Sequence, residues 1–448
     1  MPSQEIAQPY IDKPGGGQIA NQEQKAGTGL QRGDVEIMAP AGSFEALAAA
    51  IRAGADSVYF GAGGLNMRSA SSANFGLDDL RKIVRITSGL GVRSYLTVNS
   101  TLYDADLPAM RQLMDAAKDA GISAVIVSDQ AAIAYAATIG LEVHLSTQLS
   151  ISNAAALDFY RSWADVVVLA RELDLDQVAA INQSIVENDI RGPSGKPVRI
   201  ELFAHGALCL AISGKCHLSL HQYGNSANRG ACLQSCRRGY ILTDRETGDE
   251  LEVDGPFIMS PKDLKTIHFL DRVLAAGVRV LKIEGRARPP EYVSTTVECY
   301  REAVQSIIDG SYGQDKVDEW DRRLASVFNR GFWDGYYLGQ RLGQWSGAYG
   351  SSATQKRVYV GKCTNYFRNA GAASFLVESE PIAPGDLLLI TGPSTGALYA
   401  CPAELRIADV VASQAGRGTQ PSFMVERRVR TTDKLYKLVP TAKNQPNS

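Results

Sequence analysis

Several features that commonly identify a function are missing from this chain of 448 residues. No apolar run reaches the roughly 20 residues that a membrane helix needs. The opening segment MPSQEIAQPYIDKPGGG lacks the apolar core of a secretion signal, so we expect a cytoplasmic protein with no membrane partner. The formal net charge is −2, which gives no global attraction to nucleic acid. Any contact with RNA must therefore come from a local basic surface.

Three catalytic signatures are also absent. No glycine-rich GxGxxG follows the first expected strand, which weakens a dinucleotide-binding fold. No nucleophile elbow with a Ser/His/Asp order and no HExxH motif is found, which counts against hydrolysis by those routes.

From Val35 onward, short apolar runs alternate with amphipathic helical patterns, which indicates a parallel sheet. Ser43 and Asp106 are expected helix N-caps, and Gly54 and Gly121 are expected helix ends. Eight runs favour a closed (β/α)8 barrel of the TIM type over an open sheet. The runs are Val35–Ala39, Ser57–Gly61, Arg93–Val98, Ala124–Ser128, Glu142–Ser146, Val166–Ala170, Val198–Phe203 and Arg279–Ile283.

The seventh and eighth runs lie far apart, and this spacing sets the predicted domain plan. Residues 1–34, rich in Gly, Gln and Pro, are predicted to be a disordered arm. Residues 35–310 form the barrel, with a cysteine-rich insertion at about 204–278 after the seventh strand. This insertion should contain a hairpin in GYILTDRETGDELEV and a helix in SPKDLKTIHFLDRVLAAG. A helical extension and linker (311–355), a small antiparallel β-barrel (356–441) and a tail (442–448) follow.

Four of the seven cysteines fall in one segment with the spacing C-x6-C-x15-C-x3-C. The first pair is too wide for the tight knuckle of a structural zinc site, and a reduced compartment disfavours disulfides. Uneven spacing suits a [4Fe–4S] cluster, so we predict Cys209, Cys216, Cys232 and Cys236 as its ligands. A mixed Cys/His zinc site with His217 or His221 stays open. The remaining cysteines, Cys299, Cys363 and Cys401, are expected to be structural.

Polar residues follow most barrel strands, where active sites of such barrels form. Asn99, Asp129, Gln148, Arg171, Glu172, His205, Glu284 and Arg286 occupy these positions. His205 is a candidate proton donor, whereas His144 should be an inward-facing polar residue and His268 a surface or packing residue. The alternative is that some of these side chains are caps or ion pairs, for example Arg171 with Glu172.

Two basic segments could contact RNA. Arg237 and Arg238 follow the last clustered cysteine, and Arg427, Arg428 and Arg430 lie in the C-terminal region. Aromatic residues Phe423 and Tyr436 lie among the latter and could stack on bases. An ordinary solvated strand face explains the same pattern equally well.

The cysteine segment also carries a family resemblance. Glu201 is followed by HGALC at His205–Cys209, SGKC at Ser213–Cys216, and the later pair Cys232 and Cys236. Further matches, in order, are HLSTQLSISN, LAREL, MSPKDL, LKIEGRAR and NRGFWDGY. Together they resemble the peptidase U32 family over roughly residues 35 to 440, and most of all its prephenate-dependent tRNA uridine hydroxylases. The extra N-terminal arm and a shorter segment before MSPKDL depart from that pattern.

The resemblance implies an oxygen-independent hydroxylation of the wobble uridine of tRNA to 5-hydroxyuridine, with prephenate as hydroxyl donor and a [4Fe–4S] cluster. The partners would be tRNA and prephenate. His205, Glu172 and Glu284 would be catalytic, and Arg68, Asn99, Gln148, Arg171 and Arg286 would bind substrate. Arginines suit this role because prephenate carries two carboxylates. Other relatives act on ribosomal RNA or the ubiquinone ring or are named collagenases, so these activities remain alternatives, as does a zinc-stabilised RNA-binding scaffold.

Overall fold

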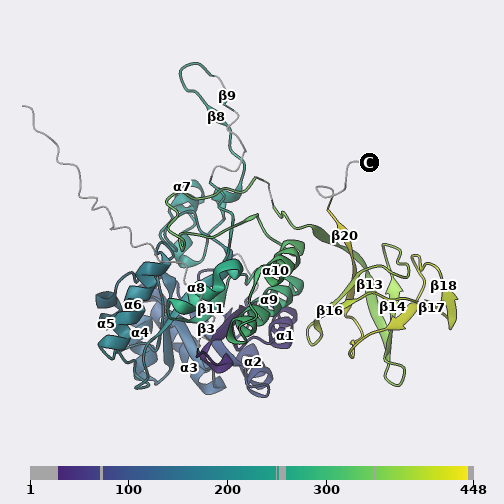
Figure 1. The fold of residues 1–448 in the computed structure, drawn as a ribbon, viewed down its shortest axis with the longest axis horizontal. Helices are drawn as coiled ribbons and strands as arrows, with labels where there is room; N and C mark the ends of the chain where they lie inside the picture. The colour runs from purple at the N-terminus through teal and green to yellow at the C-terminus, as the bar shows by residue number, and fades with distance from the viewer. Residues whose placement is uncertain (1–28, 71–73, 249, 252–258, 348–349, 442–448) are drawn as a thin grey trace, which may run out of the picture.

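The computed structural model describes residues 29–70, 74–248, 250–251, 259–347 and 350–441 (Figure 1). Most of the predicted N-terminal arm, residues 1–28, and the predicted tail, residues 442–448, lie outside the described residues. At the end of the arm, Arg32–Asp34 forms a 3-10 helix, and Arg32 forms an ion pair of 2.8 Å with Asp56.

Eight parallel strands form a closed barrel, as the alternating pattern predicts. Each strand pairs with the next, and the last, β11, pairs with both β7 and β1, which closes the ring. The strands are β1 (Glu36–Pro40), β2 (Ser57–Gly61), β3 (Arg93–Val98), β4 (Ala124–Val127), β5 (Glu142–Leu145), β6 (Val166–Val168), β7 (Arg199–Ala207) and β11 (Val278–Ile283).

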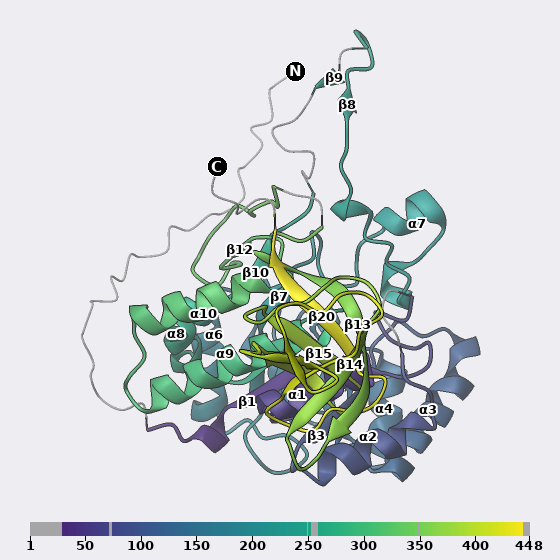
Figure 2. The ribbon, with the colours of Figure 1, turned by 90° about the vertical axis from the view of Figure 1, so that its right-hand side faces the viewer.

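Helices cover the outside of the barrel (Figure 1, Figure 2). The Ser43 side chain caps α1 by accepting a hydrogen bond from the Ala46 amide, and Gly54 ends this helix with φ 88°, as predicted. Asp106 occupies the N-cap position of α3, as predicted, but its carboxylate makes no capping hydrogen bond and instead pairs with Arg229 at 2.7 Å. The helices are α1 (Phe44–Ala53), α2 (Asp79–Ser88), α3 (Leu107–Ala120), α4 (Gln130–Thr138), α5 (Ala154–Tyr160), α6 (Leu175–Glu187), α7 (Leu218–Tyr223), α8 (Leu270–Ala275), α9 (Pro290–Ile308) and α10 (Gln314–Ser326).

A buried polar network closes the N-terminal end of the barrel. Glu36, at the start of β1, accepts hydrogen bonds from Tyr95 at 2.7 Å and from Arg199 at 2.8 Å, and it also pairs with Arg93. Burial alone would raise the pKa of Glu36, but Arg93 and Arg199 hold it below its usual value. Above this network, apolar side chains such as Met38 and Ile126 fill the interior.

The insertion after β7 departs in part from the sequence prediction. Its hairpin forms between β8 (Leu242–Thr243) and β9 (Glu250–Leu251). The predicted helix over residues 260–277 is wrong in its first half, because β10 (Asp263–Lys265) pairs antiparallel with the end of β7. The short strand β12 (Phe332–Trp333), which the sequence pattern did not indicate, pairs with β10.

The C-terminal region is an antiparallel sheet with its own apolar core, which confirms the predicted β architecture. It packs on the barrel through β15 and β16, where Leu389 and Ala397 contact Ala49 of α1. None of the helices in the described ranges combines the length and apolar character that crossing a membrane requires. The strands are β13 (Gln355–Phe367), β14 (Ala372–Val377), β15 (Leu388–Gly392), β16 (Gly396–Ala400), β17 (Leu405–Ile407), β18 (Val410–Ala412), β19 (Pro421–Met424) and β20 (Lys434–Pro440).

Candidate active site at the barrel mouth

The cysteine segment is anchored across the C-terminal end of the barrel. The Ala70 amide donates to the Gly230 carbonyl at 3.1 Å, and the Thr101 amide donates to the Asn228 carbonyl at 2.9 Å. Gly230 has φ 83°, and a Cβ there would lie 2.2 Å from the Ser69 hydroxyl oxygen, so this close approach requires glycine. The segment therefore forms one wall of the barrel mouth.

Beneath this wall lies a cavity of about 180 Å³. Side chains from the ends of β2, β3, β5, β6 and β11 line it together with the cysteine segment. All four predicted cluster cysteines line it, as do the predicted substrate-binding residues Arg68, Asn99, Gln148, Arg171 and Arg286 and the predicted catalytic residue Glu284. Arg237, predicted to bind RNA, lines it as well, so the structure brings eleven of the predicted site residues to one place.

The Glu284 carboxylate is surrounded by arginine side chains in this cavity. Its Oε1 pairs with Arg68 at 3.3 Å, and its Oε2 accepts a hydrogen bond from the Ala207 amide at 3.4 Å. Burial alone would raise the pKa of Glu284, but four arginines, Arg68, Arg288, Arg171 and Arg286, hold it below its usual value. The carboxylate is therefore ionised, and four arginines face one carboxylate.

Arg286 is held rigidly at the side of the cavity. It is 7% exposed, and its Nη1 donates to Asn66 Oδ1 at 3.0 Å and to Thr97 Oγ1 at 2.8 Å. Burial lowers its pKa to about 10, which leaves the guanidinium charged at neutral pH. A fixed, charged guanidinium is preorganised to receive a carboxylate or phosphate.

Arg171 lies against the opposite wall. Its guanidinium is 3.8 Å from the centre of the Phe203 ring, and its Nη1 donates to the Ala207 carbonyl at 3.4 Å. Its buried Nε atom has no hydrogen-bond partner within the described residues. A buried donor without a partner is costly, so this atom is suited to a ligand.

Asn99 and Gln148 form a polar edge of the cavity. Asn99 Oδ1 accepts from the Met67 amide at 3.2 Å, and its Nδ2 donates to the Ser146 hydroxyl at 3.1 Å. The Ser146 hydroxyl in turn donates to Gln148. This chain of hydrogen bonds fixes both amide side chains at the edge of the cavity.

A second buried ion pair lies lower in the barrel, and sequence reasoning missed it. Lys282 Nζ contacts Glu201 Oε1 at 2.6 Å, with 6% and 0% of the two side chains exposed. The Lys282 ammonium also lies 4.8 Å from the centre of the Tyr59 ring. Side chains two residues apart on a strand share a face, so Lys282 should point into the barrel as Glu284 does. This alternation is the sequence signal that could have predicted the ion pair.

Two further arginines at the cavity were also missed. Arg288 lies 3.5 Å and Arg330 5.1 Å from the centre of the Phe328 ring, and Arg330 pairs with Asp263 at 3.4 Å. Both belong to motifs quoted above, LKIEGRAR and NRGFWDGY. Both lie in loops and not at the first positions after a barrel strand, so a prediction based on strand ends does not include them.

The four clustered cysteines are all free thiols with access to the cavity. Burial raises the pKa of Cys236, and charge on Cys209, Cys232 and Cys216 would raise it further. The Cys216 sulfur accepts a hydrogen bond from the Leu218 amide, a contact that stabilises thiolates. Within the described ranges, no three His, Cys, Asp or Glu side chains converge on a single-ion site. Four neighbouring thiols around a cavity are the donor set that a cubane cluster uses, with one thiolate at each of four iron atoms.

His205 does not belong to this site. The pairing of β7 with β11 is irregular between Phe203 and His205, and such a bulge interrupts the alternation of side chains. Phe203 lines the cavity, whereas His205 packs among the rings of Tyr292, Tyr300 and Phe332. Burial lowers its pKa to about 3, so the imidazole is neutral, and it is not among the residues that line the cavity. The structure thus places the His205 ring outside the cavity lining, and its catalytic role stays a prediction.

Other predicted positions also lie outside the mouth cavity. Glu172 is exposed and lines a neighbouring cavity, described below. Asp129 is a helix cap, whose carboxylate accepts from the Ala131 and Leu102 amides at 3.0 Å. His144 is fully buried beside Glu142 at 3.0 Å, near the closed end of the barrel.

The predicted RNA-binding arginines have different environments. Arg237 is bound internally, because it donates to the Leu208 and Pro261 carbonyls and to the Ser260 hydroxyl. Arg427 donates to the Ala397 carbonyl. These contacts hold both guanidinium groups against the chain, and Arg237 also lines the mouth cavity. Arg238, Arg428 and Arg430 remain exposed.

The aromatic part of the C-terminal basic surface differs from the prediction. Phe423 is 3% exposed and stacks on Phe375 with ring centres 5.0 Å apart. It therefore belongs to the core of the sheet and cannot stack on a base. Tyr436 is half-buried, with its ring 5.6 Å from that of Tyr359.

The fold and site are those of a closed (β/α)8 barrel whose mouth holds a buried carboxylate, several fixed arginines and four thiols. The chain belongs to peptidase family U32, whose sequence profile matches residues 42–347. The resemblance carried by the cysteine segment is thus confirmed.

Relatives in this family carry two kinds of name. A protein of Porphyromonas gingivalis named collagenase is 57% identical over 90% of this chain and 98% of its own length. The tRNA hydroxylation protein P1 of Bacillus subtilis is 34% identical, over 66% of this chain and 69% of its own length. The 23S rRNA 5-hydroxycytidine C2501 synthase of Escherichia coli is 35% identical over 61% of this chain and 40% of its own length.

Proposed function

We propose that this protein hydroxylates carbon 5 of the wobble uridine in tRNA, in the cytoplasm and without molecular oxygen, with prephenate as hydroxyl donor. The observation that carries the proposal is the excess of arginine over carboxylate in a cavity that four thiols also line. The relatives named for tRNA hydroxylation and for 5-hydroxycytidine synthesis support an RNA base as the substrate.

The charges of the cavity suit a dicarboxylate. Prephenate brings two negative charges, and Arg68, Arg171, Arg286 and Arg288 offset Glu284 with three positive charges to spare. Arg286 and Arg171 lie on opposite walls, so each can receive one carboxylate in a two-pronged contact. Asn99 and Gln148 offer amide groups to the uracil edge from the polar side of the cavity.

Cys209, Cys216, Cys232 and Cys236 would hold the [4Fe–4S] cluster. When bound, the cluster would supply one-electron chemistry or a Lewis-acidic iron at the edge of the cavity. Arg68 pairs with Glu284 at 3.3 Å and lines the same cavity as the four cysteines. Arg68 would therefore hold an anionic substrate next to the thiolates.

The second candidate function is a peptidase, which the relative named collagenase favours. A cysteine peptidase needs a thiolate with a neighbouring histidine base. Among the residues that the structure describes, none that lines the mouth cavity is a histidine. The geometry therefore favours the hydroxylase.

The test begins with anaerobic purification and analysis of iron, sulfide and zinc. We expect about four irons per chain, lost in Cys232→Ala and retained in Cys401→Ala, a matched change of an exposed cysteine outside the cluster. Deletion of the gene should remove 5-hydroxyuridine from tRNA, and Arg171→Ala and Arg286→Ala should each raise the prephenate concentration needed for activity. Zinc without iron would support the scaffold alternative. Cleavage of collagen that survives loss of all four clustered cysteines would support the peptidase.

A further inference from the structure

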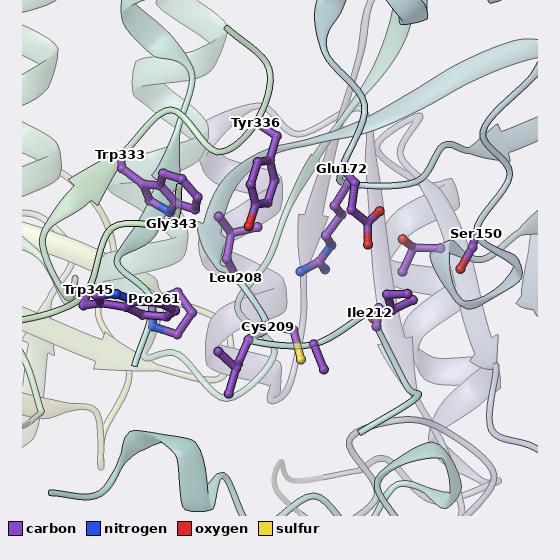
Figure 3. Close-up of a pocket in the computed structure, with 15 residues that line it drawn as sticks. Ser150, Glu172, Leu208, Cys209, Ile212, Pro261, Trp333, Tyr336, Gly343 and Trp345 are labelled. Carbon is purple, nitrogen blue, oxygen red and sulfur yellow. The ribbon is translucent and has the colours of Figure 1, made fainter. Parts of the chain in front are cut away.

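A second cavity, of about 210 Å³, adjoins the barrel mouth. Figure 3 shows Trp333, Trp345 and Pro261 on one side of it and Glu172 and Ser150 on the other. We call it the aromatic compartment.

The aromatic wall of this compartment is built and fixed. Trp333 is 5% exposed, its indole donates to the Lys262 carbonyl at 3.1 Å, and its ring lies 5.4 Å from that of Tyr336 in an edge-to-face contact. Trp345 forms a β-bridge with Pro261 and is 44% exposed. The compartment thus offers one anchored indole and one accessible indole to a planar ligand.

The aromatic compartment shares a wall with the mouth cavity. The residues common to both are Thr147, Arg171, Leu208, Cys209, Leu210 and Ser213. A ligand that extends from the mouth across this wall enters the compartment directly. Two successive nucleotides of one RNA strand match this arrangement, because each cavity could hold one base and the shared wall could face the phosphate that joins them.

Two polar side chains of the compartment, Glu172 and Arg171, can bind the polar parts of a nucleotide. Glu172 is exposed and forms no ion pair within the part of the chain that the structure describes. Its carboxylate can accept hydrogen bonds from the amino group of a base, as acidic side chains do from cytosine. The unpaired Nε of Arg171 lies in the shared wall, where a phosphate between two bases would pass.

We propose that the aromatic compartment binds the base of the nucleotide next to the reacting uridine, stacked on Trp345, with Glu172 reading an amino-bearing base. This inference rests on the proposed RNA function and deepens it. RNA is favoured over a peptide because the adjoining cavity holds an excess of arginine, which matches phosphate, and a peptide backbone carries no charge. Glu172 is thereby assigned to base recognition instead of catalysis.

The test measures binding of fluorescein-labelled RNA pentamers to the full chain by anisotropy, without prephenate. Each pentamer has a central uridine, and one neighbour is adenosine, cytidine, guanosine, uridine or an abasic site. We expect an abasic site at one of the two neighbouring positions to weaken binding roughly tenfold. In Trp345→Ala the same abasic site should have no further effect, whereas Trp345→Phe should keep the wild-type response.

Two controls separate base stacking from general damage. Trp163→Ala removes another exposed tryptophan, at 39% exposure and outside both cavities, and should leave the abasic effect unchanged. Glu172→Gln should reduce the preference for amino-bearing bases over uridine by about tenfold, without a change in the melting temperature.

The outcomes distinguish this inference from the proposed function. Hydroxylation of RNA with an equal abasic effect in the wild type and Trp345→Ala would overturn the inference and leave the function intact. Absence of RNA binding, with quenching of tryptophan fluorescence by a proline-rich peptide, would overturn both. An abasic effect that disappears only in Trp345→Ala would establish the compartment as a base-binding subsite.

Discussion

The burial of His205 predicts a specific loss of stability in acid. The imidazole is 1% exposed, and burial lowers its pKa from an ordinary value of 6.5 to about 3. The unfolded chain therefore binds a proton at this residue at a higher pH than the folded chain does. The stabilising effect of a neutral His205 is present above pH 6.5 and is lost progressively as the pH falls towards 3.

The size of this effect follows from the difference between the two pKa values. At about pH 5, which is about 1.5 units below the unfolded value, His205 should lower the free energy of unfolding by about 2 kcal/mol relative to about pH 8. In His205→Phe this part of the pH dependence should disappear. At about pH 8 the variant should keep its stability within about 1 kcal/mol, because the buried Nδ1 makes no hydrogen bond that would be lost.

The assay is urea unfolding followed by circular dichroism at both pH values. Phe332→Leu is the matched control, since it alters the packing beside the imidazole without removing the titrating group. It should lower stability equally at the two pH values. A wild-type pH dependence in His205→Phe, or a loss of RNA hydroxylation in that variant with the fold intact, would refute the burial argument and return His205 to the active site.

Three further predictions concern the backbone, the barrel interior and the basic surface. Gly206→Ala should lower the free energy of unfolding by about 1–3 kcal/mol, because φ is 108° and a Cβ would clash with a neighbouring carbonyl. An unchanged midpoint in a urea titration would contradict this prediction. Lys282→Met should cost about 3–5 kcal/mol by leaving the Glu201 carboxylate buried and unpaired. Adding Glu201→Leu should recover most of that loss, and a double variant no more stable than the single one would argue against the pairing. Replacing Arg428 and Arg430 with glutamine should reduce the slope of log affinity for RNA against log salt by about 1.4, and an unchanged slope would exclude both from phosphate contact.

The barrel strands were predictable because both faces of each strand are buried, which produces short apolar runs. The cap at Ser43 and the helix end at Gly54 were predictable because they depend on local backbone geometry. In contrast, β10 lies where the local pattern favours a helix. Its pairing with the extended end of β7 is a tertiary contact that propensity does not register.

The same distinction holds for the candidate site. Residues at regular strand ends, such as Asn99 and Arg286, reached the mouth as alternation predicts. His205 did not, because one irregular pairing between Phe203 and His205 reverses the direction of the following side chains, and a sequence pattern cannot reveal a single extra residue in a strand. Arg288 and Arg330 could not be placed because their approach to the cavity depends on loops.

The network of Glu36 with Tyr95, Arg93 and Arg199 fills the N-terminal end of the barrel, opposite the mouth cavity. Under the proposed function, prephenate, the target base and the products would all pass through this mouth. Binding would therefore be ordered. Prephenate would have to bind before the RNA covers the mouth, and the RNA would have to dissociate before the next prephenate binds. RNA added first should therefore act as a dead-end inhibitor, a consequence of closing the end of the barrel opposite the chemistry.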